Sequence, residues 1–192
     1  MTDILTLVYQ NGGFDEQEMV QIKNAHFEVR FKKGENILSF GGISDGYYIV
    51  KEGILRSYVI DFNHEEMTTE FYCQGDIVIE VVSLFQQKSS ESCIQALSEV
   101  VLYKIPFPVF QQLFLTLRGF SDWGRNWMTE ELFKLKQRNI HMITQTAAER
   151  YLKLGEEKPD IIQKAHLKHI ASHLGIKNTS LSRLRRDSIK KK

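Results

Sequence analysis

This 192-residue sequence contains only two cysteines and three prolines, and it has no long hydrophobic run. Cys73 and Cys93 lie in apolar, strand-like segments without CxxC or Cys/His spacing, so we interpret both as buried free thiols in a reducing compartment. No apolar segment approaches the roughly 18 residues that span a bilayer. The N-terminus carries the acidic Asp3 where a secretory signal needs positive charge. We therefore expect a cytoplasmic protein that has no membrane partner.

The near-neutral net charge of +1 hides a strong asymmetry along the chain. Residues 1–143 carry 13 basic and 19 acidic side chains, a net charge of −6, whereas residues 144–192 carry 12 and 5, a net charge of +7. A basic segment attached to an acidic body is typical of a small module that binds nucleic acid or phosphate. A solvated basic tail would carry the same charge, so charge alone does not distinguish a binding module from such a tail.

Residues 27–105 have the pattern of short strands separated by turns. Apolar residues alternate in "YYIVKEGILRSYVI", and glycines recur between the apolar runs. An Asp-Gly pair at 45–46 and a Lys-Glu-Gly corner at 51–53 suit hairpins. Repeated short strands of this kind predict an antiparallel β-roll, a jelly-roll-like barrel, within an α+β fold.

A helical period replaces the strand pattern after Pro108. Apolar side chains from Phe110 to Leu135 recur at spacings of three and four, which predicts one long helix with an interruption at Gly119 or Gly124. A stripe that contains two tryptophans is too apolar for a solvated linker. It packs on the barrel, on a second copy of the chain, or on both.

The last segment has the pattern of a helix-turn-helix. Thr146 and Glu149 have capping-box spacing, which predicts a helix from about 147 to a C-cap at Gly155. Two further helices are expected near 166–173 and 178–187. In "LKHIASHLGIKNTSLSRLRR", Ala171 is the small contact residue and Gly175 the turn. The apolar anchors are Ile170, Leu174, Ile176, Leu181 and Leu184.

The second helix of this pair is expected to enter the major groove of double-stranded DNA. Residues on its polar face read the bases, with Arg183 suited to guanine and Asn178 to adenine. The predicted base-reading residues are Asn178, Thr179, Ser182 and Arg183, and the predicted phosphate contacts are Lys168, Lys177, Ser180, Arg185 and Arg186. The chain then closes on Lys190, Lys191 and Lys192, which are expected to strengthen binding to any sequence.

Three histidines, His166, His169 and His173, share one side of the first helix of the pair. A His pair at i, i+4 can bind a metal, but no carboxylate or thiol has matching spacing. We interpret them as outward-facing imidazoles that lie in solvent or beside phosphate, and we expect no metal site.

A β-roll, a long helix and a C-terminal helix-turn-helix, in that order, resemble the Crp/Fnr superfamily of bacterial transcription regulators, and the C-terminal motif is similar to that of Bacteroidetes-type members. Gly34, Gly53 and Gly75 stand at the turn glycines of its cyclic-nucleotide-binding-type barrel. The resemblance implies an effector domain over 1–120, a dimerisation helix over 121–143 and a DNA-binding domain over 144–192. It also implies a homodimer on a two-fold operator, with an unidentified small-molecule effector or none.

The segment that would bind a cyclic nucleotide departs from the family pattern. Asp76 stands where we expect a Glu for the ribose, and no Arg occurs between Arg56 and Arg118 to neutralise the phosphate. We therefore expect no tight binding of cyclic AMP. The residues that we assign to an effector pocket are Gly75, Asp76, Ile77, Glu80, Ser89, Ser90 and Trp127.

Other chemistries fit the sequence less well. An iron-sulfur sensor would need cysteines near the N-terminus, and His64, a candidate haem ligand, reads as part of an exposed hairpin turn, so we expect no cofactor. A cupin-like enzyme would need converging His ligands, but the barrel region holds only His26 and His64. We predict a sequence-specific transcription regulator that is not an enzyme. The alternative is an interaction module with a ligand-free barrel and non-specific nucleic-acid binding.

Overall fold

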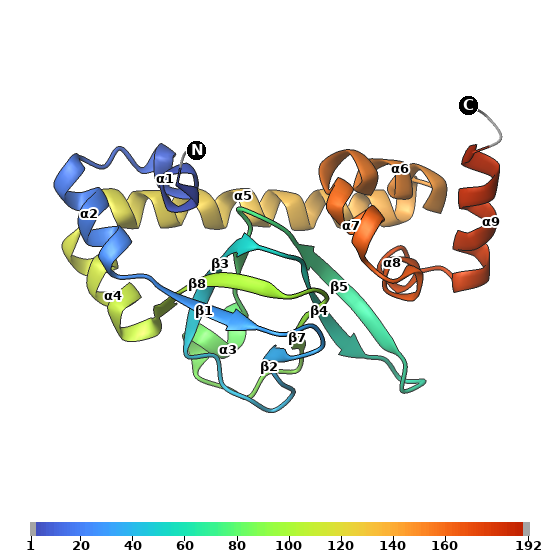
Figure 1. The fold of residues 1–192 in the computed structure, drawn as a ribbon, viewed down its shortest axis with the longest axis horizontal. Coiled ribbons are helices and arrows are strands. Elements are labelled where there is room, and N and C mark those ends of the chain that lie inside the picture. The colour runs from blue at the N-terminus through green and yellow to red at the C-terminus, as the bar shows by residue number, and fades with distance from the viewer. Residues whose placement is uncertain (1–2, 190–192) are drawn as a thin grey trace.

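The computed structural model describes residues 3–189, with side chains described as far as residue 186. Two four-stranded antiparallel sheets form its centre (Figure 1). The first has the order β1 (Phe27–Phe31), β8 (Val100–Pro106), β3 (Gly46–Glu52), β6 (Ile77–Val78). The second has the order β2 (Asn36–Leu38), β7 (Cys93–Ala96), β4 (Leu55–Ile60), β5 (Glu66–Tyr72).

Apolar side chains from both sheets meet in one core. Val50, Val78 and Leu102 come from the first sheet and Leu55 and Ile94 from the second, and all five are buried. The predicted α+β fold with an antiparallel roll is confirmed, but the predicted closure into a barrel is wrong. No strand pairing joins the two sheets within residues 3–189. One edge strand of each sheet is very short, with two residues in β6 and three in β2, so these edges offer few free peptide groups for closure.

The turn between β3 and β4 requires a glycine. Gly53 has φ +92°, and a Cβ at this position would lie 2.4 Å from the carbonyl oxygen of Glu99. Only glycine combines the positive φ with this close approach of two backbones.

Three helices and the first turns of the long helix pack against the first sheet, outside the core that the two sheets share. They are α1 (Ile4–Tyr9), α2 (Glu16–Asn24) and α4 (Phe107–Thr116), with the 3₁₀ turn η1 (Gln10–Gly12) after α1. Tyr9, Ile22, Ile105, Phe120 and Trp123 form the buried centre of this region. A further short helix, α3 (Val81–Gln86), follows β6.

The long helix breaks at a different place from the prediction. α4 ends before Leu117, whose φ of −107° and ψ of 108° are extended, and α5 (Arg118–Thr144) then runs without interruption through both glycines. A Cβ at Gly119 would lie 3.0 Å from the Gly12 carbonyl oxygen, and one at Gly124 would lie 3.1 Å from the Phe114 ring. These glycines therefore permit close packing and do not break the helix.

The C-terminal region contains α6 (Ala147–Glu157), α7 (Pro159–Lys164), α8 (Leu167–His173) and α9 (Asn178–Ile189). The predicted capping box is confirmed, since the Glu149 amide donates to Thr146 Oγ1 at 3.3 Å and the Thr146 amide to Glu149 Oε2 at 2.7 Å. The predicted C-cap at Gly155 is wrong. α6 continues to Glu157 because the helix is stopped by Pro159, which disfavours helical backbone at Lys158.

Candidate DNA-reading helices and effector groove

α8 and α9 form a helix pair around one tight turn. Gly175 has φ +68°, and the Ile176 amide donates to the Ala171 carbonyl at 3.0 Å. Ala171, Leu174 and Leu181 are buried between the helices and the neighbouring α6 and α7, in one apolar cluster with the partly buried Ile176. The small contact residue, the turn glycine and the apolar anchors therefore occupy the positions that a helix-turn-helix needs.

The residues assigned to DNA contact lie on the outside of this pair. Those with exposed side chains are Lys168, Lys177, Asn178, Thr179, Ser180, Ser182, Arg183 and Arg186, and Arg185 is half-buried. Figure 1 shows α9 at the end of the molecule opposite α1 and α2, with its outer side uncovered. Ser182 donates its hydroxyl hydrogen to the Asn178 carbonyl at 3.0 Å, so this serine is partly engaged by its own helix. Lys190, Lys191 and Lys192 lie outside the described residues.

The inner side of α8 packs on strand β5 of the second sheet. Ile54, Phe71 and Leu97 of the sheet region share one apolar cluster with Ile170 and Leu174 of the helix pair. Thr68 donates its amide to Ser172 Oγ at 3.2 Å, and Ser172 Oγ donates to Thr68 Oγ1 at 3.1 Å. The helix-turn-helix is thus seated on the roll by both apolar and polar contacts.

This docking changes the interpretation of two histidines. His166 is exposed as expected, but the expectation of outward-facing rings is wrong for His169 and His173. His169 is 6% exposed and accepts a hydrogen bond from Arg56 at 2.7 Å, while His173 Nδ1 accepts one from Arg138 at 3.1 Å. Burial lowers the pKa of His169 to about 4 and that of His173 to about 3, so both rings are neutral acceptors at pH 7.

Arg56 is the polar centre of this interface and is only 1% exposed. Its guanidinium donates to Glu66 at 2.5 Å and to Gln95 Oε1 at 2.9 Å, in addition to His169, and it stacks 4.0 Å above the Tyr58 ring. One buried cation from β4 therefore holds strands β5 and β7 and helix α8 together. Sequence reasoning missed this role, because nothing local marks an Arg in a strand as a partner for a His 113 residues away.

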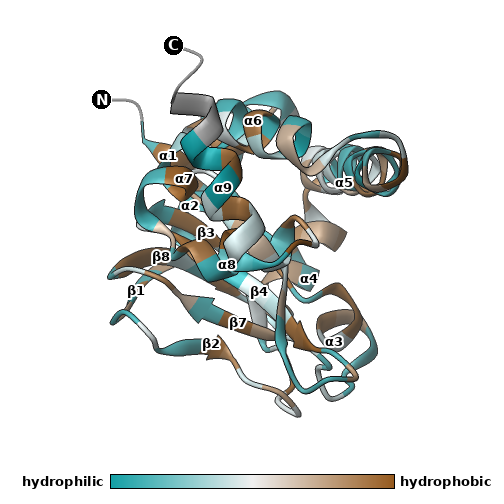
Figure 2. Cartoon of the chain, turned by 90° about the vertical axis from the view of Figure 1, so that its right-hand side faces the viewer, coloured by the Kyte–Doolittle hydropathy of each residue, from teal (hydrophilic) through white to brown (hydrophobic). Residues whose placement is uncertain are grey.

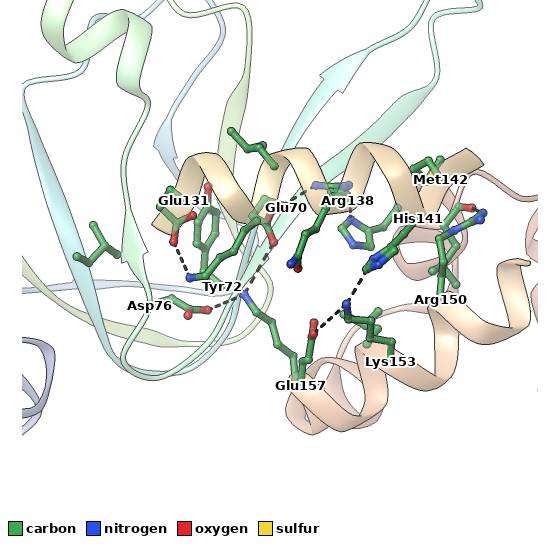
Figure 3. Close-up of a pocket in the computed structure, with 18 of the residues that line it drawn as sticks. Glu70, Tyr72, Asp76, Glu131, Arg138, His141, Met142, Arg150, Lys153 and Glu157 are labelled. Atoms are coloured by element: carbon green, nitrogen blue, oxygen red, sulfur yellow. Dashed lines mark hydrogen bonds and ion pairs between the residues drawn. The ribbon is translucent and has the colours of Figure 1, made fainter. Parts of the chain in front are cut away.

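A groove of about 580 Å³ lies between the roll, α5 and α6. The β5–β6 region contributes Tyr72 and Asp76, α5 contributes Trp127 and Arg138, and α6 contributes Arg150. Figure 3 shows His141, Arg150 and Lys153 at one end of the groove and Tyr72, Asp76 and Glu131 at the other. Its size is suitable for a metabolite-sized ligand.

Comparison with known proteins assigns the central part of the chain. Residues 28–116 match the family described as the cyclic nucleotide-binding domain. Residues 28–116 therefore resemble a cyclic nucleotide-binding domain. Beyond this domain the match extends in structure. A transcriptional regulator of the Crp/Fnr family from Eubacterium rectale aligns over 92% of this chain and 85% of its own, with a TM-score of 0.70 at 18% identity. FixK2 from Bradyrhizobium japonicum aligns over 86% and 85%, also with a TM-score of 0.70, at 16% identity.

Two curated relatives match in sequence. Anaerobic regulatory protein from Haemophilus influenzae is 28% identical over 100 residues, which are 52% of this chain and 38% of that protein. Electron transport regulator A from Shewanella oneidensis is 24% identical over 119 residues, 62% and 47% of the two chains. The match thus spans less than half the length of these relatives. Together with the structural matches, it confirms the resemblance in fold to the Crp/Fnr superfamily.

The seven residues assigned to an effector pocket occupy different places in the structure. Gly75, Asp76, Ile77 and Trp127 line the groove. Glu80 lines a separate pocket of about 260 Å³ with Ser44, Tyr48 and Lys104. Ser89 is exposed, and Ser90 is buried with its hydroxyl bonded to the Ser92 carbonyl at 2.9 Å. The structure therefore brings four of the seven together.

The predicted acidic ligand contact in the domain, Asp76, is already engaged. It accepts hydrogen bonds from the Cys73 amide at 2.9 Å and from Lys158 Nζ at 2.8 Å. Burial works to lower the pKa of Lys158, but Asp76 and Glu70 outweigh burial and raise it, so the ammonium keeps its charge. Asp76 thus ties the β5–β6 turn of the domain to the end of α6.

Two further observations concern the whole described chain. Within residues 3–189, no cluster of three or more His, Cys, Asp or Glu side chains is placed to hold a metal ion, and no helix has the length and apolarity of a membrane span. Cys73 and Cys93 are free thiols, Cys93 buried and Cys73 partly buried, and burial raises the pKa of Cys73 to about 11. At neutral pH Cys73 is therefore a thiol and a poor nucleophile.

Proposed function

We propose that this chain is a sequence-specific DNA-binding transcription regulator that acts as a homodimer. The observation that supports this best is the exposed polar and basic face of α9 on a helix pair whose inner side is buried. The regulators that it resembles in fold support the same function. The proposal divides the chain into an effector domain over 1–120, a dimerisation helix over 121–143 and a DNA-binding domain over 144–192.

The dimer would form along α5. Figure 2 shows this helix end on, standing to one side of the rest of the molecule, so its outer surface is uncovered. Met128, Leu132, Leu135 and Met142 are 45%, 62%, 55% and 43% exposed, and with Asn139 they follow one another at spacings of four, three, four and three. This is the a/d pattern of a two-stranded coiled coil, in which one Asn at an a position favours a dimer in a single register.

In the DNA complex, the N-terminal turns of α9 would lie in the major groove. Arg183 would donate two hydrogen bonds to a guanine and Asn178 would pair with an adenine, while Thr179 and Ser182 lie beside them. Lys168, Lys177, Ser180, Arg185 and Arg186 would contact phosphates and set the orientation of the helix. The acidic remainder of the chain would repel DNA, so affinity depends on this end.

Selection of random double-stranded DNA on the purified full chain tests the proposal. A two-fold consensus establishes sequence reading and the dimer together. Arg183→Ala should cost about 1–3 kcal/mol on the consensus and relax base preference at one position. Lys168→Ala should weaken all sequences alike and reduce the salt dependence, whereas Lys33→Ala, an exposed lysine between β1 and β2, should change neither. No enrichment at low salt would refute the proposal, and binding without a consensus would favour the non-specific interaction module.

A further inference from the structure

Charged side chains from several elements line the groove between the roll, α5 and α6. At one end they form ion pairs, and at the other end positive charge is only partly paired. At one end, each of three carboxylates has a cation of its own. The pairs are Glu70 with Arg138 at 3.3 Å, Asp76 with Lys158 at 2.8 Å and Glu131 with Lys134 at 2.6 Å. This end is electrostatically closed and has no charge left for a ligand.

The other end carries positive charge without full compensation. Arg150 is half-buried and forms no ion pair within the described residues. Lys153 shares Glu157 at 3.6 Å and donates to His141 Nδ1 at 3.3 Å. Arg150 and Lys153 together thus face a single carboxylate. A partly desolvated guanidinium without a counter-ion favours binding of an anion, especially one that accepts two hydrogen bonds.

The hydrogen bonds of Arg150 occupy two of its five N–H donors and leave the others for such an anion. Its NH1 group donates to the Gln145 carbonyl at 2.5 Å and its NH2 group to the Leu174 carbonyl at 2.8 Å. Arg150 Nε, however, is buried without a hydrogen-bond partner, and so is Gln145 Oε1, within the described residues. Buried polar atoms that lack a partner are rare and costly, so an anion that accepts a hydrogen bond from Arg150 Nε gains affinity.

We propose that this groove binds a small molecule carrying a carboxylate or phosphate group, and that Arg150 holds the anionic group with Lys153 and His141 beside it. Tyr72, Ile77 and Trp127 line the groove and offer an apolar surface to the rest of such a molecule. The charge pattern excludes a cationic ligand, because the carboxylates at the far end are already paired.

Arg150 also connects the ligand to the DNA-reading helices. Gln145 is the first residue after α5, and Leu174 is the last residue before the turn glycine of the helix pair. An anion bound to Arg150 would therefore act at the junction of the long helix, α6 and the helix-turn-helix. This regulatory consequence rests on the proposed function, whereas the binding site itself does not.

Isothermal titration of the full chain with inorganic phosphate and with succinate, in chloride buffers of equal ionic strength, tests the site without DNA. We expect saturable binding of at least one anion below about 10 mM, weakened at least tenfold by Arg150→Gln and by Lys153→Gln. Lys134→Gln, the same kind of change at the closed end, should alter affinity less than twofold. Binding of phosphate alone would assign a phosphate-bearing ligand, and binding of succinate alone a carboxylate.

Some outcomes would overturn the proposal. One is the absence of saturable heat of binding for either anion. The other is an equal loss of anion affinity in Lys134→Gln and Lys153→Gln. Because Arg150 also holds two carbonyls, its variant is checked by far-ultraviolet circular dichroism, and the variant of the partly exposed Lys153 decides the test if Arg150→Gln does not fold. A chain that binds anions at this site but selects no DNA would retain the site and lose only the proposed function.

Discussion

Replacing Arg56 by alanine should loosen the seat of the helix-turn-helix on the roll. The truncation removes a guanidinium that is 1% exposed and leaves His169 Nδ1 and Gln95 Oε1 without their donor. A buried polar group left unpaired costs about 1–3 kcal/mol. Breaking a buried ion pair costs about 3–5 kcal/mol, but the Glu66 side chain is 42% exposed and its carboxylate can turn to water, so the ion pair adds little. Two unpaired groups then lower the free energy of unfolding by about 2–6 kcal/mol.

Urea unfolding followed by circular dichroism measures this loss, which corresponds to a fall of about 4–24 °C in Tm for a chain of this size. Arg30→Ala is the matched control. The Arg30 side chain is 72% exposed and forms a surface ion pair with Glu28, so this substitution should change the free energy of unfolding little. A double-mutant cycle between Arg56→Ala and His169→Ala should give a coupling of at least about 1 kcal/mol. Loss no larger than that of Arg30→Ala, or no coupling, would refute the assignment of Arg56 as the polar centre of the interface.

Three other predictions concern the two buried histidines, two glycines of the C-terminal helices and the binding of cyclic AMP. The pKa values of His169 and His173 are lowered to about 4 and 3 in the folded chain, so as the pH falls the unfolded chain binds protons before the folded chain does. The free energy of unfolding should therefore be highest above pH 6.5 and fall as the pH approaches 4. His169→Asn should reduce this pH dependence, as measured by urea titrations at several pH values. Gly175→Ala should cost about 1–2 kcal/mol because φ is +68°, whereas Gly155→Ala, inside α6 with 3.7 Å of clearance, should stabilise by up to about 1 kcal/mol; thermal unfolding distinguishes the two. Calorimetry with cyclic AMP should show no binding at micromolar concentrations, and tight binding would show that another group replaces the missing Arg.

The features that sequence predicted well are those set by residues close together in the chain. The capping box at Thr146 and Glu149 and the turn at Gly175 each involve a few neighbouring residues, and so does the anchoring by Ala171 and Leu181. Short-range hydrogen bonds and backbone geometry determine them, whatever the rest of the fold does. The order of strands and helices follows from hydrophobic period for the same reason.

The predictions were wrong where contacts between residues far apart in the chain determine the local structure or the burial of a side chain. Gly119 and Gly124 read as helix breakers, but the close approach of η1 and of Phe114 explains both. His169 and His173 read as outward-facing because the polar side of α8 gives no sign that β5 covers it. The residues assigned to one effector pocket lie in two cavities and in the loop between α3 and β7, since sequence spacing does not show how a loop folds back.

The shared apolar cluster that joins Phe71 and Leu97 to Ile170 and Leu181 also bears on modularity. A fragment that begins at residue 144 would expose Ile170 and Leu174 to water and would leave Phe71 bare on the roll that it abandons. The region of α8 and α9 is therefore not an independent module, and grafting it onto another protein would require a replacement for the strand beneath it. For the same reason, the roll and the C-terminal helices should melt as one cooperative unit, and an exchange of either part must preserve both sides of this contact.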